Sequence, residues 1–345
     1  MNKPVTMKTI AAHAGVTQAT VSMCLSNNPR IPAATRERIC AIATQLGYRP
    51  NPFVSALMRV RRQGRAVLTN PMIALVNGLD HPAAWRKNPS PTVRSMLEGA
   101  KERAEYRGYR TREFWLHEEA MSSERFSGML HARGIAGLVI GPLAVDAPVP
   151  DLKWEHFSSV RLGVPHTALT ITTVCNDHFF SALQVVRECH KLGYRRPGLA
   201  ILRNHRERFL GRWGGGVQAG VELLPGLKPT PALLLENWET LEPVAAWMER
   251  HKPDVIVSPS ADVLLAHIKK LGRQVPRDVG LVSLACLQPA SPVSGIWQNG
   301  ALIGAAAIDT LISMLERHER GLPAQAQAFM IEGVWNPGRT LRSPA

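Results

Sequence analysis

The beginning of the chain carries two short helical patterns joined by a single glycine, and this pair limits what the segment can fold into. Apolar residues recur at helical spacing from Met7 to Ala14, Thr6 stands where an N-cap belongs, and Gly15 follows at once. Thr17 can cap a second helix that runs to about Ser26. The sequence therefore predicts two helices that meet at a tight turn.

A third helix is predicted next. Pro32 suits a first helical turn, an apolar stripe runs from Ile39 to Leu46, and Gly47 ends the pattern. Three short helices around a small apolar core form a helix-turn-helix module, whose second helix reads the major groove of DNA. We therefore assign residues 1–50 to a DNA-binding domain.

Positive charge is concentrated at the same end of the chain. Residues 1–65 hold ten Lys or Arg and one acid, Glu37, so they carry +9 of the total charge of +14. Such a local excess is the electrostatic footprint of a polyanion-binding protein. The basic run from Arg59 to Arg65 is either a solvated connector or a phosphate contact. An anionic membrane surface is ranked lower, because no amphipathic segment pairs an aromatic and Leu face with a Lys-rich one.

Composition argues against several classes of protein. No apolar run approaches the ~18–20 residues that span a bilayer, and the first residues lack the apolar stretch of a signal peptide. We therefore expect a cytoplasmic protein without a membrane partner. The five cysteines lie singly, which favours free buried thiols over disulfides or zinc. The histidines show no metal-binding spacing, so no metal site is predicted.

From Leu68 onward, strand and helix patterns alternate, which predicts an α/β fold with parallel sheets covered by helices. About 270 residues exceed one core of ordinary size, so we expect two doubly wound lobes with a ligand cleft between them over residues 69–345. The expected strands are 72–76, 137–140, 159–163, 199–202, 255–257 and 280–284. The expected helices are 93–107, 177–192, 214–224, 240–251, 262–271 and 303–319.

The motifs at the start of the chain resemble those of the lactose-repressor (LacI/GalR) family. The match is dense over about 55 residues and looser afterwards. The matching segments include Ala14-Gly15-Val16-Thr17, Thr20-Val21-Ser22, Leu46-Gly47-Tyr48-Arg49-Pro50-Asn51, Gly193-Tyr194-Arg195-Arg196-Pro197 and Gly338-Arg339-Thr340. The resemblance implies a homodimeric transcription regulator, a repressor of a pseudo-palindromic operator, with a body like periplasmic sugar-binding proteins.

At the positions that contact DNA in the family, this sequence carries residues able to make such contacts. Gln18 could hydrogen-bond base edges and Ala19 could touch a thymine methyl. Hydroxyl groups nearby could hold phosphates, although capping or solvation is the alternative for each. Met23 stands where arginine is frequent, and a thioether cannot make the bidentate contact with guanine, so the operator should differ. The full set of expected DNA-binding residues is Thr6, Thr17, Gln18, Ala19, Ser22, Met23, Arg30, Asn51, Val54 and Leu57.

Residues 51–68 are expected to form a hinge helix followed by a basic linker. By resemblance, Asn51 to Leu57 folds on the operator, and Leu57 inserts into the minor groove at a cost of a few kcal/mol that the bent duplex offsets. Packing between two hinges is the alternative for Leu57. Val54 stands where alanine is usual, and its β-branched side chain is a poorer helix former.

The effector cleft is less clearly marked. By resemblance, Asp177 and Arg212 would bond a sugar-like ligand, Trp213 would stack on it, and Trp297 would lie near the ligand or the interlobe hinge. The alternatives are a helix cap for Asp177, a surface ion pair for Arg212 and a core position for Trp297. The family's acids are missing from Val257 to Ser260 and from Ser283 to Cys286. Either the ligand differs from ordinary monosaccharides, or no small effector is needed.

Two other classes of function compete with a DNA-binding regulator. A ligand-binding protein without DNA function would be expected to have a signal peptide and a neutral N-terminus, which the sequence does not show. A nucleotide-dependent enzyme would need a phosphate-binding glycine pattern, and Gly211 to Gly216 lacks one. We therefore expect neither an enzyme nor a cofactor.

Overall fold

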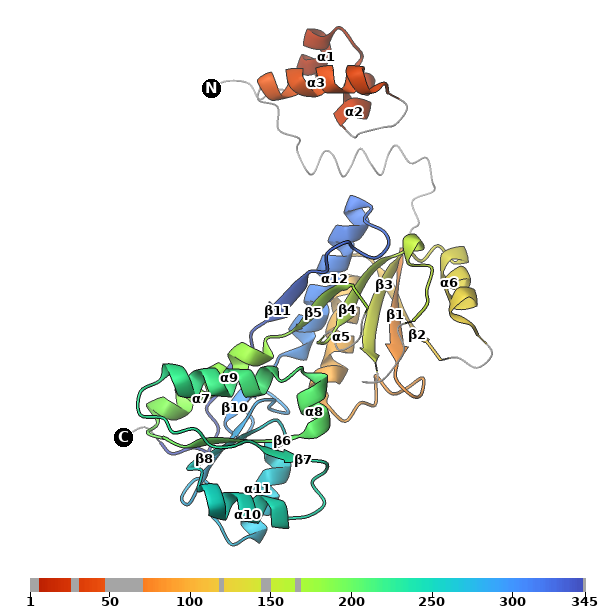
Figure 1. Ribbon diagram of the computed structural model, residues 1–345. Coiled ribbons are helices and arrows are strands. Elements are labelled where there is room, and N and C mark those ends of the chain that lie inside the picture. Colours follow the sequence, from red (N-terminus) through yellow and green to blue (C-terminus); the bar gives the residue numbers. More distant parts are fainter. Residues whose placement is uncertain are drawn as a thin grey trace. The chain divides into compact units, whose positions relative to one another are not determined.

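The computed structural model describes residues 6–25, 31–46, 71–117, 121–143, 150–164 and 169–343. Internal contacts divide the chain into two compact units, Met1–Thr69 and Asn70–Ala345 (Figure 1). We call the first unit the head and the second the body. Within the described ranges, no helix is long and apolar enough to cross a lipid bilayer.

The head is a three-helix module, as the sequence predicts. Its helices are α1 (Met7–Ala14), α2 (Gln18–Leu25) and α3 (Ala33–Gln45). They enclose one small apolar cluster, and seven of its side chains are buried: Ile10, Ala11, Ala14, Val21, Cys24, Ile39 and Ala43. These residues recur at helical spacing on each helix, so each helix presents one apolar face to the others.

The turn between α1 and α2 is fixed by local chemistry. Thr6 caps α1 in a reciprocal pair with Thr9, in which each backbone N–H donates to the other residue's hydroxyl at 3.3 Å. Gly15 ends the helix with a φ of +63°, a conformation that favours glycine. Arg38 of α3 donates to the carbonyl of Ala14 at 3.2 Å and so ties the end of α1 to α3.

The body begins with a lobe that we call the N-lobe, built on a parallel sheet in the order β11-β5-β4-β3-β1-β2. Helices α5 and α12 cover one face of this sheet, and α6 packs on the other (Figure 1). The strands are β1 (Met72–Gly78), β2 (Arg110–Trp115), β3 (Gly137–Leu143), β4 (Ser158–Leu162), β5 (Thr172–Asn176) and β11 (Ala328–Ile331). The helices are α5 (Pro91–Tyr106), α6 (Ser123–Ala132) and α12 (Gly300–Arg317), with a short 3-10 turn at Trp154–His156.

The second lobe, the C-lobe, has a sheet in the order β12-β10-β9-β8-β6-β7, parallel except for β12 against β10. Helices α7 and α9 cover one face, and α10 and α11 cover the other. The strands are β6 (Pro197–Leu202), β7 (Leu233–Leu235), β8 (Val255–Ser258), β9 (Gly280–Ser283), β10 (Gly295–Trp297) and β12 (Val334–Asn336). The helices are α7 (His178–Lys191), α8 (Arg203–Arg208), α9 (Arg212–Leu223), α10 (Glu242–His251) and α11 (Ala261–Lys270).

Every strand and helix expected in the body is present, with ends shifted by a few residues. The expectations missed β2, β5, β7, β10, β11 and β12 and the helices α6 and α8. Strand β2 lies at a sheet edge and exposes charged side chains, so it lacks a long apolar run. Strands β7, β10 and β12 have three residues each, too few for a pattern to stand out.

Within the described residues, the chain passes between the lobes three times. The crossings are Asn176 to His178, Trp297 to Gly300 and Ile331 to Val334. Each lobe's sheet therefore includes strands from distant parts of the chain, so neither lobe is formed by one continuous segment. The strand ends at these crossings bring residues of both lobes to one cavity.

Candidate nucleic-acid interface and ligand cleft

Helix α2 presents its first turn to solvent. Thr17, Gln18 and Ala19 are exposed, and α2 carries no acidic residue. Met23 is half-buried one turn further on, whereas Ser22 is buried with 7% of its surface exposed. The helix thus offers an amide and a methyl group at its exposed start, which are the groups expected to meet base edges.

The threonine hydroxyls at the helix starts have structural roles of their own. Thr17 Oγ1 accepts from the backbone N–H of Thr20 at 3.1 Å and lies 2.9 Å from the Thr20 hydroxyl. Thr6 takes part in the capping box of α1. The capping alternative is therefore present at Thr6 and Thr17. A hydroxyl has two acceptor lone pairs and one proton, so capping does not by itself use up its capacity for a phosphate.

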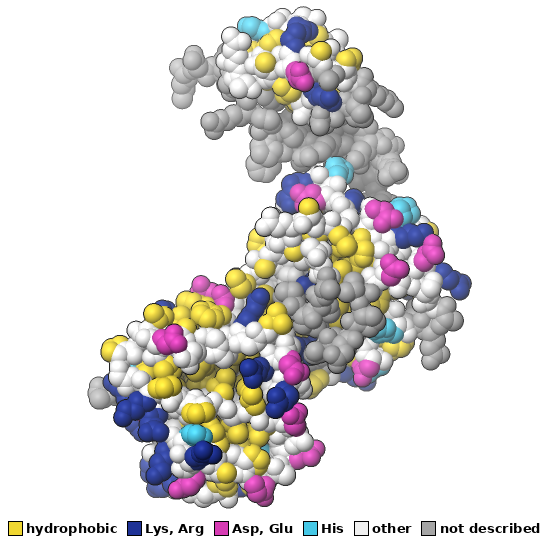
Figure 2. Space-filling model, viewed as in Figure 1, with side chains coloured by type: hydrophobic (Ala, Val, Ile, Leu, Met, Phe, Trp, Pro, Cys, Tyr) yellow, Lys and Arg dark blue, Asp and Glu magenta, His cyan; other side chains and the backbone are white. Residues whose placement is uncertain are grey.

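Four of the expected DNA contacts lie outside the described residues: Arg30, Asn51, Val54 and Leu57. The expected hinge helix and basic linker, residues 51–68, lie outside them too. On the face that Figure 2 shows, acidic and basic side chains are interspersed over the body. The concentrated positive charge belongs to residues 1–65 of the sequence.

A cavity of about 90 Å³ lies between the N-lobe and the C-lobe. Its walls come from the start of α5, the ends of β3 and β4, the crossings after β5 and β10, and the end of α8. The polar side chains among its described lining residues are Ser90, Thr92, Arg161, Asn176, His178, Arg208 and Gln298. This is the position beyond the strand ends where open α/β sheets bind ligands.

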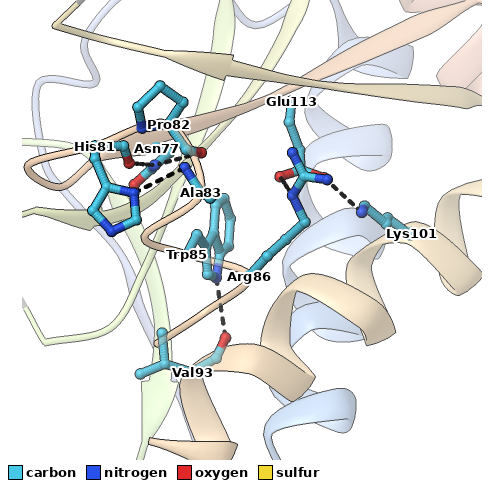
Figure 3. A network of polar contacts seen from close by, with 9 residues as sticks. All are labelled: Asn77, His81, Pro82, Ala83, Trp85, Arg86, Val93, Lys101 and Glu113. Carbon is cyan, nitrogen blue, oxygen red and sulfur yellow. Dashed lines mark hydrogen bonds and ion pairs between the residues drawn. The ribbon is translucent and has the colours of Figure 1, made fainter. Parts of the chain in front are cut away.

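The loop that leads to α5 is held in place by a network of polar contacts (Figure 3). Asn77, 1% exposed at the end of β1, donates through Nδ2 to the carbonyl of His81 at 2.9 Å and accepts from the N–H of Leu79 at 3.1 Å. Trp85 donates to the carbonyl of Val93 at 3.0 Å. These bonds fix the start of α5, which forms one wall of the cavity.

Asp177 occupies a crossing, but its carboxylate has a structural partner. Oδ1 accepts from the backbone N–H of Phe180 at 2.9 Å and so caps α7. The capping alternative is therefore realised for Asp177. Its side chain is not among the described lining residues of the cavity.

Arg212 reaches from the first turn of α9 toward the N-lobe. Its Nη1 lies 3.9 Å from the sulfur atoms of Cys175 and Met330. In the part of the chain that is described, no carboxylate lies within ion-pair distance of Arg212. The surface ion pair considered as its alternative is thus not formed by the described residues.

Trp213 lies inside an aromatic cluster. It is 3% exposed, its ring centroid is 4.4 Å from that of Phe209, and His178 stacks on Phe209 at 4.6 Å. Its Nε1 has no hydrogen-bond partner among the described residues. Burial lowers the pKa of His178 to about 3, so this imidazole is neutral near pH 7. The ring of Trp213 is packed against protein, which leaves little face for stacking on a ligand.

Trp297 is half-buried at the end of β10, and in the register of the sheet it pairs with Val334 of β12. It is a crossing residue rather than a fully buried core one, and its neighbour Gln298 lines the cavity.

None of the described polar residues that line the cavity was in the expected set, which held neighbours of three of them: Asp177 beside Asn176 and His178, and Trp297 beside Gln298. One signal was available: Arg161 falls inside the expected strand 159–163, and a charge in a buried strand needs an explanation.

Comparisons with known proteins agree with this architecture. Residues 6–51 match the family model of bacterial regulatory proteins of the lacI family. The chain is 26% identical to the HTH-type transcriptional regulator CelR of Thermobifida fusca, over 90% of this chain and 92% of the relative. A solved CelR–cellobiose complex superposes with a TM-score of 0.60 at 18% identity, covering 97% of this chain and 99% of the other. A Lac repressor dimer bound to operator and the anti-inducer ONPF gives 0.54 at 20% identity, covering 99% and 100%.

The helix-turn-helix head, the match of its residues to the family model and the two-lobed, periplasmic-binding-protein-like body agree with one another. Residues 6–51 therefore form a helix-turn-helix head of the lacI-family type, and the chain as a whole is similar to DNA-binding transcriptional regulators of that family.

Proposed function

We propose that this protein represses transcription by binding a pseudo-palindromic operator as a homodimer, under the control of a small molecule held between its lobes. The observation that carries the proposal is the geometry of the head. A glycine turn at Gly15 sets α2 at the surface, and Gln18 and Ala19 are exposed on its first turn. An exposed amide at the start of a recognition helix is suited to base edges in the major groove.

We assign recognition of the DNA sequence to α2, with Gln18, Ala19 and Met23 as candidate base contacts. Thr6, Thr17, Ser22 and Arg30 are candidate phosphate contacts that fix the register on the duplex. Asn51, Val54 and Leu57 would belong to a hinge segment within residues 51–68, with Leu57 as the apolar wedge in the minor groove. Residues 69–345 would then bind the effector and hold the dimer together.

Homodimer formation follows from how such heads read DNA. One α2 helix covers only a few base pairs, so a two-fold dimer reading two half-sites supplies the affinity and register that one head lacks. The Lac repressor structure with the same fold is described as a dimer bound to operator.

A ligand between the lobes is supported by the cavity itself. The relative CelR was solved as a complex with cellobiose, which makes a sugar-like effector the first hypothesis. In that hypothesis Arg212 and Trp297 lie near the ligand, Asp177 acts mainly through α7, and Trp213 supports the cavity wall. Since the relatives are transcriptional regulators, we also propose that the protein acts without catalysis.

Selection of bound sequences from random DNA tests the DNA-binding part of the proposal. We expect a pseudo-palindromic consensus, and we expect the Gln18→Ala variant to lose preference at one position of each half-site, by about 1–3 kcal/mol. Met23→Arg should shift preference toward guanine at its own position. Gln45→Ala, an exposed change at the end of α3, is the matched control.

Recovery of no enriched sequence would contradict the proposal and favour a ligand-binding protein without DNA function. An unchanged consensus in both α2 variants would remove α2 as the reader while leaving DNA binding itself in place.

A further inference from the structure

Two arginines from different lobes face the cavity between them. Arg161 comes from β4 of the N-lobe and is only 2% exposed, and Arg208 comes from the end of α8 in the C-lobe. Among the described residues that line the cavity, there is no Asp or Glu. The lining therefore brings together two positive charges with no negative charge from its own described walls.

The partner of Arg208 among the described residues is a neutral group. Its Nη2 donates to the carbonyl of Leu143, on the opposite lobe, at 3.2 Å. Burial lowers the pKa of this guanidinium, and no carboxylate of the described residues counteracts the effect. Removing a cation partly from water without an opposite charge nearby costs free energy. An anion placed beside it would offset this cost, which favours binding of the anion.

Arg161 is held in the sheet by the Thr173 hydroxyl, to which its Nη2 donates at 3.2 Å. Burial also lowers the pKa of Arg161. Arg212 adds a third positive charge near this wall, since its Nη1 lies 3.9 Å from the Cys175 sulfur, one residue before Asn176. Two guanidinium groups thus line the cavity, and a third lies close to the end of β5.

The acid that follows Asn176 in the chain already has a partner, and two amides of the lining are bonded to backbone carbonyls. The carboxylate of Asp177 caps α7. Asn176 donates its amide to the carbonyl of Ile331 at 3.0 Å, and Gln298 donates to that of Leu284 at 3.2 Å. His178 is neutral and 5% exposed, and its Nδ1 has no hydrogen-bond partner among the described residues.

We propose that the cavity between the lobes binds the carboxylate or phosphate group of a small anionic metabolite, with Arg208 and Arg161 as its cationic partners. The planar fork of a guanidinium matches both groups, and two forks from opposite lobes can hold one anion between them. The cavity of about 90 Å³ exceeds several times the ~10–15 Å³ that a single water needs, so it has room for such a group.

This inference rests on the proposed function, since it assumes that the body binds an effector, and it changes the class of effector. A neutral sugar would leave the half-buried guanidinium of Arg208 without an opposite charge. An anion would join the lobes through charge, because each lobe supplies one of the two arginines.

Titration calorimetry on the full chain in about 0.15 M NaCl tests the proposal with matched probes. The probes are D-glucose, D-gluconate and D-glucose 6-phosphate, then D-ribose, D-ribonate and D-ribose 5-phosphate, and inorganic phosphate alone. We expect an anionic member of a series to bind and its neutral counterpart not to bind. Binding by the acids alone assigns a carboxylate, and binding by the phosphate esters alone assigns a phosphate.

Variants locate the binding. Arg208→Gln should weaken the anion about ten-fold to a hundred-fold, because it removes a charge-assisted hydrogen bond. Arg208→Lys should fall between that variant and the wild type, since it keeps the charge and loses the fork. Arg206→Gln, an exposed change on the same helix, is the control and should bind as the wild type does. Melting curves without ligand check that each variant is folded.

Three results would overturn the inference: neutral sugars that bind as tightly as their acids, anion binding that survives in folded Arg208→Gln, or no binding of any anionic probe. The proposed function has a separate readout, the operator selected from random DNA. If the chain binds anions but selects no operator, the ligand class stands and the role as a regulator is contradicted. If it selects an operator but binds no anion, the role as a regulator stands and the ligand class is contradicted.

Discussion

At the scale of single residues, burial of titratable groups couples the stability of the body to pH. His178 is packed against Phe209 and Trp213, and burial lowers its pKa to about 3. Burial also lowers the pKa of His205 and of His267. In the unfolded chain, each imidazole takes up a proton near pH 6.5. The folded state therefore holds fewer protons than the unfolded state over the interval between these values.

Stability should consequently fall as the pH drops from about 6.5 toward 3, because the unfolded state binds the extra proton. For His178 the loss between pH 6.5 and 5 is about 2 kcal/mol, at ~1.4 kcal/mol per pH unit. Urea unfolding at both pH values measures it, and His178→Phe, which keeps a ring on Phe209, should be less sensitive to acid. His131→Gln, an exposed change, is the control. Equal acid sensitivity in wild type and His178→Phe would show that this burial does not set the pH dependence.

Removing the charge of Arg208 gives a second prediction at this scale. Without ligand, Arg208→Gln should be at least as stable as the wild type, since burial disfavours its guanidinium and no carboxylate in the described part of the chain compensates it. Thermal unfolding in the absence of small anions checks this. A clear loss of stability would mean that the bond to Leu143 matters more than the cost of burying the charge.

At the scale of elements, the sequence predicted the long helices and buried strands because their apolar residues repeat with a clear period. It missed the true start of α12, expecting Ile303 where the helix begins at Gly300. Glycine is a poor helix former, so the apolar pattern did not predict a helix start at Gly300. The glycines of α12 are explained by its tertiary contact with α5. A Cβ at Gly304 would lie 2.0 Å from the carbonyl oxygen of Met96, and one at Gly99 would lie 2.1 Å from that of Ala301. Such close packing of α5 on α12 depends on both helices and cannot be found from either one.

Gly304→Ala should therefore destabilise the body by about 1–3 kcal/mol, because the added methyl forces the two helices apart. Gly128→Ala in α6 is the matched control: its added methyl meets nothing within 4 Å, so it should be neutral or stabilise by up to ~1 kcal/mol. Urea unfolding of both variants gives the comparison. Equal stabilities would show that α5 and α12 can separate without cost.

The same limit explains what could be predicted of the candidate site. The three-helix head is local in sequence, so its caps, turn and core followed from spacing alone. The cavity lies where the ends of β3 and β4 meet α8. Both strands end more than forty residues before α8 begins. Arg161 and Arg208 therefore carried no shared sequence signal, and Asp177, which matched a motif, proved to cap a helix.

At the scale of the whole molecule, charge is divided unevenly between the head with its linker and the body. Residues 1–65 carry +9, and the remaining 280 residues carry +5. A regulator arranged in this way should hold DNA largely through phosphate neutralisation and counterion release. Its body should then influence DNA binding through the geometry of the dimer rather than through direct attraction.

The affinity for the selected operator should accordingly fall linearly on a plot of log K against log salt, with a slope of about −5 to −9 for a dimer that neutralises roughly 6–10 phosphates. Fluorescence anisotropy between about 50 and 200 mM salt measures the slope. The double variant Arg61→Ala, Arg62→Ala should make the slope shallower by ~1 for each phosphate that is no longer neutralised, and should weaken all sequences alike. Removal of two charges from the body, with Lys269→Ala and Lys270→Ala, should leave the slope unchanged. A slope that responds equally to both pairs would place phosphate-binding groups on the body and contradict this division of charge.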